Sequence, residues 1–513
     1  MGKNIKQENG YRVLEKLCSL YVVVVASVYL LAVPLSGYTV IAEYKYKLFL
    51  ALNITFIIVL CLFWCEYKLI GKLSEYPQTD RVKPELICMA LFFLFSVISG
   101  LLSEYTGVFW GNGRKDGILT IGTYVLVFLF LFRFLRPSKW ILRVFAVSTS
   151  LFCALGLVQL FGLNPFGLYP EGLDFYDGGI YYAGEYWSTM GNTDICASFL
   201  ALSLGVFAAV MVRKPKPLYL IPLGLCVFCI WMLDVSSGVV AMLLGLILLL
   251  PVVVDTNGSL CNALCTYGFI LLITALAFAM SFSRDGAAFS FGLESALTTA
   301  IAIILIVAAI IVHKTCILET ASPKSVRKGL LFFILIILIV SVLGLYLYED
   351  FQSGFLQEAH EMLHGNLRDD FGSHRIYIWK QVFAKVKEHW LFGGGPDTLS
   401  FREIEGFSRY SDELGILIES GIDVAHNEYL NILVNQGALS FLAYLGMLVL
   451  SLKDWWFTAT KETEKAIAGA GVLFYCIQAF FGISMYINSL YLWISLAMLN
   501  IKTIQTKRSL DYA

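Results

Sequence analysis

Long apolar runs separated by short polar loops dominate the pattern of this 513-residue chain. Runs such as "LYVVVVASVYLLAVPL" and "LLFFILIILIVSVLGLYLY" contain no charged residue. About 20 apolar residues in a helix cross the ~30 Å hydrocarbon core of a bilayer. The hydrophobicity is continuous rather than alternating, which favours helices over a transmembrane barrel. The pattern therefore predicts an all-α, polytopic integral membrane protein.

These runs predict about 12–14 transmembrane helices. The expected spans are 17–35, 46–66, 85–104, 117–135, 140–162, 193–212, 218–234, 238–254, 264–283, 296–313, 330–348, 437–453, 466–485 and 488–501. One long polar segment interrupts them. We therefore expect membrane helices with short loops over 1–348, a large loop of amphipathic helices over 349–436, and C-terminal membrane helices with a tail over 437–513.

Lysine and arginine mark one side of the predicted bundle. The loops at 163–191 and 234–238 contain neither residue. By the positive-inside rule, the basic side is cytoplasmic, both termini lie inside and the large loop lies outside. The basic residues are Lys3, Lys6, Arg12, Lys16, Lys68, Lys72, Arg81, Lys83, Arg213, Lys214, Lys216, Lys314, Lys324, Arg327, Lys328, Lys502, Lys507 and Arg508.

Composition agrees with a membrane protein and excludes some partners. Hydrophobic residues make up 58% of the chain, charged residues 15%, and mean hydropathy is +0.74. Soluble domains carry about 25% charged residues. A net charge of −1 gives no reason to expect a nucleic-acid partner. The large loop has none of the 12 cysteines, so we expect no disulfide framework.

The large loop holds the candidate chemistry. "RIYIWKQVFAKVKEHW", starting at Arg375, has the apolar spacing of an amphipathic helix, and the Gly393–Pro396 turn ends it. A second helix is predicted from about Val424 to Asn435, with His426 on one face. Glu428 points to a different face of that helix, so we expect it to be solvated.

Several motifs, taken in order, resemble the O-antigen ligase and O-antigen polymerase family of bacterial membrane glycosyltransferases. The motifs are Gly113-Arg114-Lys115-Asp116-Gly117, Gly191-Asn192, Arg375-Ile376-Tyr377-Ile378-Trp379, Leu391-Phe392-Gly393-Gly394-Gly395-Pro396, and His426-Asn427 followed by Gly437. The resemblance covers most of the chain, and the ordered combination is more specific than any single motif.

This resemblance implies a GT-C-like fold in a bacterial cell (inner) membrane. It implies transfer of a glycan from an undecaprenyl-type polyprenyl pyrophosphate to a sugar hydroxyl of a glycan or lipid acceptor. Charge develops on the leaving pyrophosphate, and arginine suits phosphate oxygens. We therefore expect no metal or other cofactor. The implied catalytic residues are His426, as base, and Arg375; the implied substrate-binding residues are Arg114, Asn427, Gly191 and Asn192.

The chain departs from the family pattern at one turn. Where the family carries Ser-Arg-Gly, this sequence reads Ser236-Ser237-Gly238, so one cation is missing. Arg284 and Arg402 are candidates to replace it. The motifs do not separate a ligase from a polymerase.

Two alternatives from other classes remain open. His360-Glu361-Met362-Leu363-His364 has the H-E-x-x-H spacing of zinc proteases. Gly365 would end that helix at once, however, and no third ligand follows at a recognisable spacing. A lipid-linked glycan flippase is the other alternative, although no internal repeat of the kind common in transporters is evident.

Overall fold

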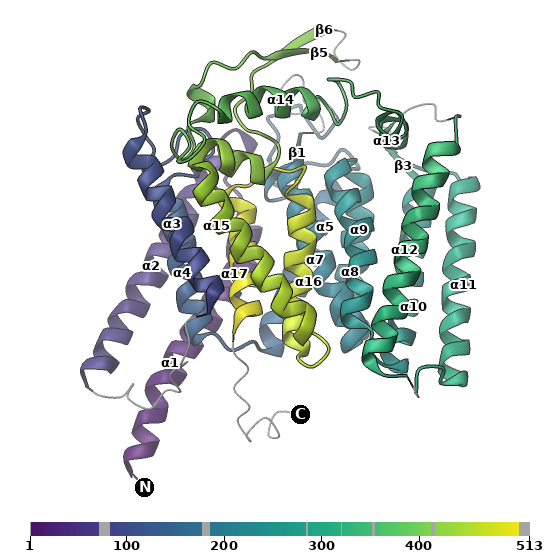
Figure 1. The fold of residues 1–513 in the computed structure, drawn as a ribbon, viewed down its shortest axis with the longest axis horizontal. Coiled ribbons are helices and arrows are strands. Elements are labelled where there is room, and N and C mark those ends of the chain that lie inside the picture. Colours follow the sequence, from purple (N-terminus) through teal and green to yellow (C-terminus); the bar gives the residue numbers. More distant parts are fainter. Residues whose placement is uncertain are drawn as a thin grey trace.

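The computed structural model describes residues 2–70, 83–176, 185–283, 286–319, 321–350, 354–411 and 416–501. Within these ranges the chain forms a helical bundle with short helices and hairpins gathered over one end (Figure 1). Nine helices of the described residues are long and apolar enough to cross a membrane. The predicted all-α, polytopic membrane fold is confirmed.

Each predicted span corresponds to a helix of the structure. The bundle helices are α1 (Gly2–Val24, continued by the π-helix Val25–Tyr29), α2 (Ile41–Leu69), α3 (Pro84–Leu102), α4 (Ile118–Phe134), α5 (Lys139–Gln159), α7 (Thr193–Arg213), α8 (Leu220–Met232), α9 (Ser236–Val253), α10 (Asn257–Ala279), α11 (Leu293–Thr315), α12 (Pro323–Leu347), α15 (Glu428–Thr458), α16 (Thr463–Gln478) and α17 (Tyr486–Asn500). Three short 3₁₀-helices are Tyr38–Val40, Pro217–Tyr219 and Leu399–Phe401.

The elements over the end of the bundle are two helices and three antiparallel hairpins. They are α13 (Phe355–Leu363), α14 (Arg375–Val386), β1 (Tyr186–Trp187) with β2 (Gly191–Asn192), β3 (Met280–Ser283) with β4 (Gly286–Phe289), and β5 (Phe407–Ser411) with β6 (Ile416–Ser420). The hairpin β5–β6 was not expected from the helical reading of this segment. Its strands were too short to give a distinct hydrophobic period.

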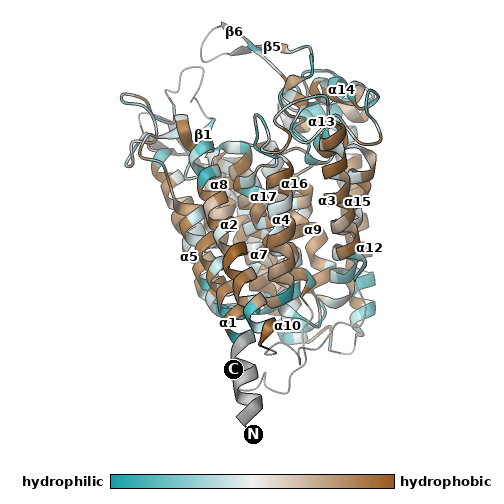
Figure 2. Cartoon of the chain, turned by 90° about the vertical axis from the view of Figure 1, so that its left-hand side faces the viewer, coloured by the Kyte–Doolittle hydropathy of each residue, from teal (hydrophilic) through white to brown (hydrophobic). Residues whose placement is uncertain are grey.

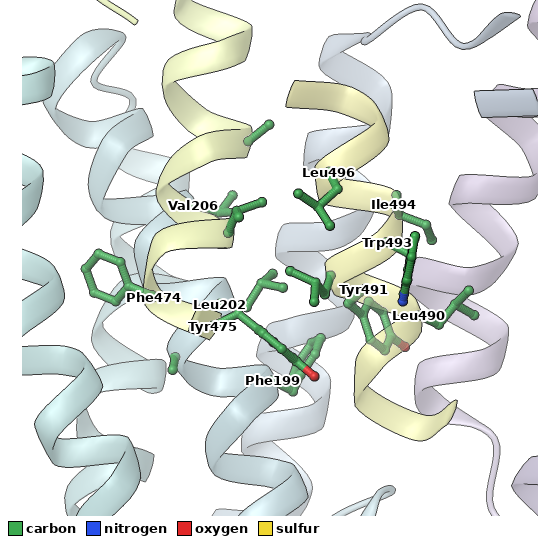
Figure 3. Close-up of a cluster of buried hydrophobic side chains, with 14 of the residues drawn as sticks. Phe199, Leu202, Val206, Phe474, Tyr475, Leu490, Tyr491, Trp493, Ile494 and Leu496 are labelled. Atoms are coloured by element: carbon green, nitrogen blue, oxygen red, sulfur yellow. The ribbon is translucent and has the colours of Figure 1, made fainter. Parts of the chain in front are cut away.

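Helix α7 forms the centre of the bundle. All of its most apolar window is buried, against α8, α9, α16 and α17 among others. Gly205 of α7 and Gly471 of α16 leave no side chain at the contact, and a methyl group on either would collide with the facing helix. Small residues allow this close approach in membrane helices. Figure 3 shows the apolar side chains from α7, α16 and α17 that meet there.

Helices α11 and α12 lie at one edge of the bundle and expose most of their apolar side chains (Figure 1). Hydrophobic residues cover the length of the helices, while hydrophilic residues gather toward the two ends (Figure 2). This distribution suits helices that face lipid along their length. Lys72, Arg81, Lys502, Lys507 and Arg508 of the basic set lie outside the described residues.

Helix α15 is broken at Gly437, where φ is +81° and ψ is 174°. The segment from Trp390 to Gly395 fits beside the break. Gly394 and Gly395 donate backbone hydrogen bonds to the carbonyls of Val434 and Asn435 at 3.3 and 2.8 Å. Beyond the break, Ala438 donates to the Trp390 carbonyl at 2.9 Å. The two helices predicted over 424–435 and 437–453 are therefore one kinked helix that begins only at Glu428.

Gly393 and Gly437 explain why this junction requires glycine. A Cβ atom on Gly437 would lie 2.3 Å from the Leu391 carbonyl oxygen, and one on Gly393 would lie 2.4 Å from the backbone of Asn435. Both residues also have positive φ angles, which favour glycine. The glycine-rich turn is thus a rigid joint between the membrane helices and the segment that carries α13, α14 and the hairpin β5–β6. This segment is called the outer segment, because it is predicted to lie outside the cytoplasm.

Candidate functional site

Asp194 and Arg375 form an ion pair that joins the bundle to the outer segment. Asp194 lies in the first turn of α7, and Arg375 is the first residue of α14. Arg375 Nη2 lies 3.2 Å from Asp194 Oδ1, with 13% and 17% of the two side chains exposed. Arg375 also donates from Nε to the Phe481 carbonyl at 2.9 Å and from Nη1 to the Gly372 carbonyl at 2.8 Å. These acceptors fix the plane of the guanidinium.

His426 faces the same carboxylate. Its Nδ1 atom lies 3.8 Å from Asp194 Oδ2, which is too long for a hydrogen bond but close enough for an electrostatic contact. This contact favours the tautomer that carries its proton on Nδ1, leaving Nε2 able to accept a proton. His426 has a φ angle of +46°, an uncommon conformation for a residue other than glycine.

Arg114 completes the group from the loop before α4. Its Nη2 atom lies 2.8 Å from Asp423 Oδ2, and 49% of the Asp423 side chain is exposed. Arg114 also interacts electrostatically with Asp194. The buried Nε of Arg114 has no hydrogen-bond partner among the described residues. The guanidinium of Arg114 is therefore held by one half-exposed carboxylate, whereas that of Arg375 is held by three acceptors.

Asp397 holds the Arg114 loop in place. It directly follows the Gly393–Pro396 turn, and its Oδ2 atom accepts backbone hydrogen bonds from Asn112, Arg114 and Asp116 at 2.6, 3.1 and 3.3 Å. Burial raises the pKa of Asp397, and these N–H donors partly oppose that rise. The glycine-rich joint on α15 thus fixes the position of Arg114 through a single carboxyl group.

Gly191 and Asn192 set the start of α7 and so place Asp194. Gly191 has a φ angle of +83°, and Asn192 accepts a hydrogen bond from the backbone N–H of Ile195 at 3.2 Å as the N-cap residue. Asn427 does the same for α15, accepting from the Leu430 N–H at 3.0 Å. These three residues therefore have a structural role here, and their contact with substrate stays a prediction.

Glu428 corrects one expectation. It was expected to be solvated, but only 5% of it is exposed, and it accepts hydrogen bonds from the hydroxyls of Tyr444 and Tyr475, the latter at 2.9 Å. Its backbone N–H donates to the Ala479 carbonyl. Helix α15 begins alongside the end of α16, so its first turn is already inside the bundle. The sequence pattern predicted the face of the helix on which Glu428 lies, but not how deep in the bundle the helix begins.

Arg402 is not placed as a replacement for the missing arginine. It is 4% exposed and donates to the Thr398 hydroxyl and the Val434 carbonyl, both at 3.0 Å, beneath the glycine-rich turn. Burial lowers the pKa of its guanidinium. Arg402 thus supports the turn. Arg284, the other candidate, lies outside the described residues.

The H-E-x-x-H segment ends as expected, because α13 stops at Leu363. His360 Nδ1 lies 2.7 Å from the Leu345 carbonyl oxygen, and the His364 ring stacks on Tyr346 with centroids 4.3 Å apart. Glu361 lies 3.7 Å from Arg368. Across the described ranges, no group of three or more His, Cys, Asp or Glu side chains is arranged to hold a metal ion. The geometry of α13 therefore gives no support to the zinc protease alternative.

An apolar groove of about 360 Å³ lies beside the ion pair. It is lined by Leu244, Tyr429, Cys476, Ile477, Phe480 and Phe481. Phe481 belongs to both features, because its carbonyl accepts the Arg375 hydrogen bond and its side chain lines the groove. A hydrocarbon chain in this groove would therefore lead directly to the charged group.

Asp194 is the functional candidate that sequence reasoning missed. It is the only acidic residue in α7, and it closely follows the Gly191-Asn192 motif. A carboxylate at the end of an otherwise apolar membrane helix is a signal that could have been used. Its partners could not have been named, because they come from distant parts of the chain.

The fold and the site define a polytopic helical membrane protein with a group of arginine, histidine and aspartate residues at one end of its bundle. Residues 270–445 match the family model described as O-antigen ligase. This segment is about a third of the chain, and its match supports the family resemblance drawn from the motifs. The matched segment includes Arg375 and His426, while Arg114 and Asp194 lie before it. A search of curated proteins found no match to the chain.

Proposed function

We propose that this protein transfers a glycan from a polyprenyl pyrophosphate donor to a sugar hydroxyl, at the outer face of a bacterial cell membrane. The observation that carries the proposal is the convergence of Arg375, Arg114 and His426 around Asp194 beside an apolar groove. The O-antigen ligase match supports the same reaction class.

The diphosphate of the donor binds at Arg114. Its Nη2 atom is paired with Asp423, which is exposed enough to leave when a stronger anion arrives. Arginine binds phosphate oxygens through two parallel hydrogen bonds. Arg375, held in place by Asp194, adds a fixed positive charge near the leaving group. Fixed charges of this kind stabilise the charge that develops as the anomeric bond breaks.

His426 accepts the proton of the acceptor hydroxyl. The hydroxyl oxygen forms a bond to the anomeric carbon, and the bond from that carbon to the phosphate oxygen breaks. The electron pair leaves with the pyrophosphate, and the hydroxyl proton passes to Nε2 of His426. Asp194, facing Nδ1, stabilises the imidazolium that results.

The polyprenyl tail lies in the apolar groove formed by Leu244, Tyr429, Phe480 and their neighbours. The groove leads from the lipid-facing helices to Phe481 beside Arg375. Asn427, Gly191 and Asn192 complete the substrate site, and the segment over 349–436 forms the outer part that covers it. The basic end of the bundle faces the cytoplasm in this orientation.

The test uses the purified chain in nanodiscs with a synthetic polyprenyl pyrophosphate-linked oligosaccharide and a glycan acceptor, without nucleotide sugar. We expect acceptor-dependent release of polyprenyl pyrophosphate that a chelator does not abolish. Release restored only by added zinc would overturn the proposal, as would movement of intact donor across the bilayer without any transfer. Whether the product is a longer chain or a glycan joined to a lipid would distinguish a polymerase from a ligase.

A further inference from the structure

A second cavity, of about 560 Å³, opens at the end of the bundle opposite Asp194. Asp194 lies in the first turn of α7, whereas Lys214, at the mouth of this cavity, directly follows the last turn of the same helix. The volume falls within the range of about 300–1,000 Å³ that is common for ligand sites. The cavity is thus separate from the proposed glycan site.

The walls of this cavity are largely apolar and come from several different elements. Val25 belongs to the π-helix, Leu142 to α5, Val206 to α7, Ile467 to α16 and Ile494 to α17. Figure 3 shows Leu202, Val206, Tyr491 and Ile494 from this wall within the central apolar cluster. Water is a poor occupant for such a space, because few polar groups line it to receive hydrogen bonds. Protein interiors are otherwise close-packed, so a space of this size calls for an apolar occupant.

The mouth of the cavity is basic. Lys139, Lys214 and Lys216 line it, with Glu464 as the one acidic residue. Lys214 lies 3.6 Å from Glu464, but both side chains are 58% exposed, so this pair is weak. Lys216 makes no ion pair with any described residue. The mouth therefore has an excess of positive charge next to the apolar interior of the cavity.

We propose that this cavity binds one anionic phospholipid, with an acyl chain between α5, α7, α16 and α17 and its phosphate at Lys214 and Lys216. An ion without a hydrocarbon chain would leave the apolar walls unfilled, and a neutral lipid would leave the positive charge of Lys216 unbalanced. Basic pockets between membrane helices bind anionic lipid head groups in this way. The bound lipid holds the basic ends of α5 and α7 together, away from the reacting groups.

The experiment is native mass spectrometry of the delipidated full chain with dioleoyl phosphatidylglycerol or dioleoyl phosphatidylcholine. We expect one tightly retained phosphatidylglycerol and weaker retention of phosphatidylcholine. The double variant Lys214→Ala/Lys216→Ala should bind phosphatidylglycerol about tenfold or more weakly. The control, Lys68→Ala/Lys453→Ala, removes the same charge from exposed lysines outside the cavity and should bind as wild type does.

A second variant tests the apolar interior of the cavity. Ile467 is a partly buried residue of the cavity wall, and Ile467→Trp places a large ring there. This variant should lower retention of phosphatidylglycerol while leaving the lysines unchanged. Equal retention of the two lipids by the wild-type chain would overturn the proposal. So would equal losses in the lysine double variant and its control. Lipid retention is measured separately from glycan transfer. The test of the lipid site therefore does not depend on the proposed enzymatic function.

Discussion

The side chains of Asp194 and Arg375 lie 3.2 Å apart although the residues are 181 positions apart in the chain. This ion pair connects the central membrane helix to the first residue of the outer amphipathic helix. The same carboxylate faces His426. One largely buried aspartate therefore sets the relative positions of the two residues that the sequence motifs had singled out.

Asp194→Asn tests that arrangement. The amide keeps the shape of the side chain but removes the charge that balances Arg375 and faces His426. We expect glycan transfer to fall by about 100-fold or more, with a lower melting temperature, because breaking a largely buried pair leaves a buried charge uncompensated. Asp234→Asn is the matched control, since Asp234 is exposed and lies at the end of α8, on the same side of the bundle. Near-normal transfer by the Asp194 variant would remove it from the site.

The variant His426→Asn separates the role of the imidazole in catalysis from the backbone conformation at this position. Asparagine tolerates the positive φ angle that His426 adopts, whereas alanine would add strain of its own. We expect a melting temperature within about 2 °C of wild type and a loss of transfer of about 100-fold or more, because the base is gone. His389→Asn removes an exposed histidine from the same outer segment and should leave transfer unchanged. Retained transfer in the His426 variant would contradict its role as base.

Arg114 and Asp423 should respond in opposite directions. Arg114→Lys keeps the charge but loses the planar, two-pronged contact with phosphate, so the KM for donor should rise about tenfold. Asp423→Asn removes the carboxylate that now occupies Arg114, so the KM should fall severalfold. Steady-state kinetics over a range of donor concentrations measures both. A rise in KM for both variants would mean that Asp423 does not compete with the donor.

Gly437→Ala should disrupt the joint between α15 and the glycine-rich turn. The added methyl group meets the Leu391 carbonyl oxygen at 2.3 Å and the φ angle of +81° opposes it. We expect a loss of about 2 kcal/mol or more in unfolding free energy and a parallel loss of transfer. Gly344→Ala is the control, because no described atom lies within 4 Å of its added Cβ, and it should leave stability unchanged or slightly higher. Thermal unfolding in detergent measures the stability of both variants relative to wild type.

Asp116→Asn tests the carboxyl group of Asp116, which is partly buried and interacts electrostatically with Asp397. Burial, together with Asp397 and Glu428, raises the pKa of Asp116 well above its usual range. A carboxyl with a raised native pKa contributes stability below its unfolded pKa of about 3.9, and that contribution is lost as the pH rises through the native value. The asparagine side chain does not ionise, so the variant does not lose stability in this way as the pH rises. The variant should therefore melt about 2 °C or more above wild type at pH 7, with the difference shrinking toward pH 4. A lower melting temperature at pH 7 would contradict this account of Asp116.

The sequence predicted the membrane helices well because each one is a continuous apolar run long enough to cross a bilayer. It predicted Arg375, His426 and Gly437 because family motifs mark them. It also gave Arg114 through the Gly113–Gly117 motif. Arg114, Arg375 and His426 come from separate segments, and the structure brings them around the carboxylate of Asp194.

The parts that were wrong or missed depend on contacts between distant segments. Glu428 was taken as solvated because the helical period gives a face but not the depth at which the helix begins. Arg402 was a candidate to replace the missing arginine, although the structure buries it beneath the glycine-rich turn. The break at Gly437 depends on the backbone of Trp390–Gly395 fitting beside it. None of these contacts leaves a periodic signal in the sequence.

The most direct measurement is a structure of the protein in nanodiscs with a non-transferable polyprenyl pyrophosphate-linked sugar bound. The account predicts the diphosphate on the guanidinium of Arg114 in place of Asp423, close to Arg375, with the anomeric carbon near Nε2 of His426. It also predicts the hydrocarbon tail along Phe480 and Phe481. A diphosphate bound away from both arginines, or a tail that enters from another face of the bundle, would contradict it.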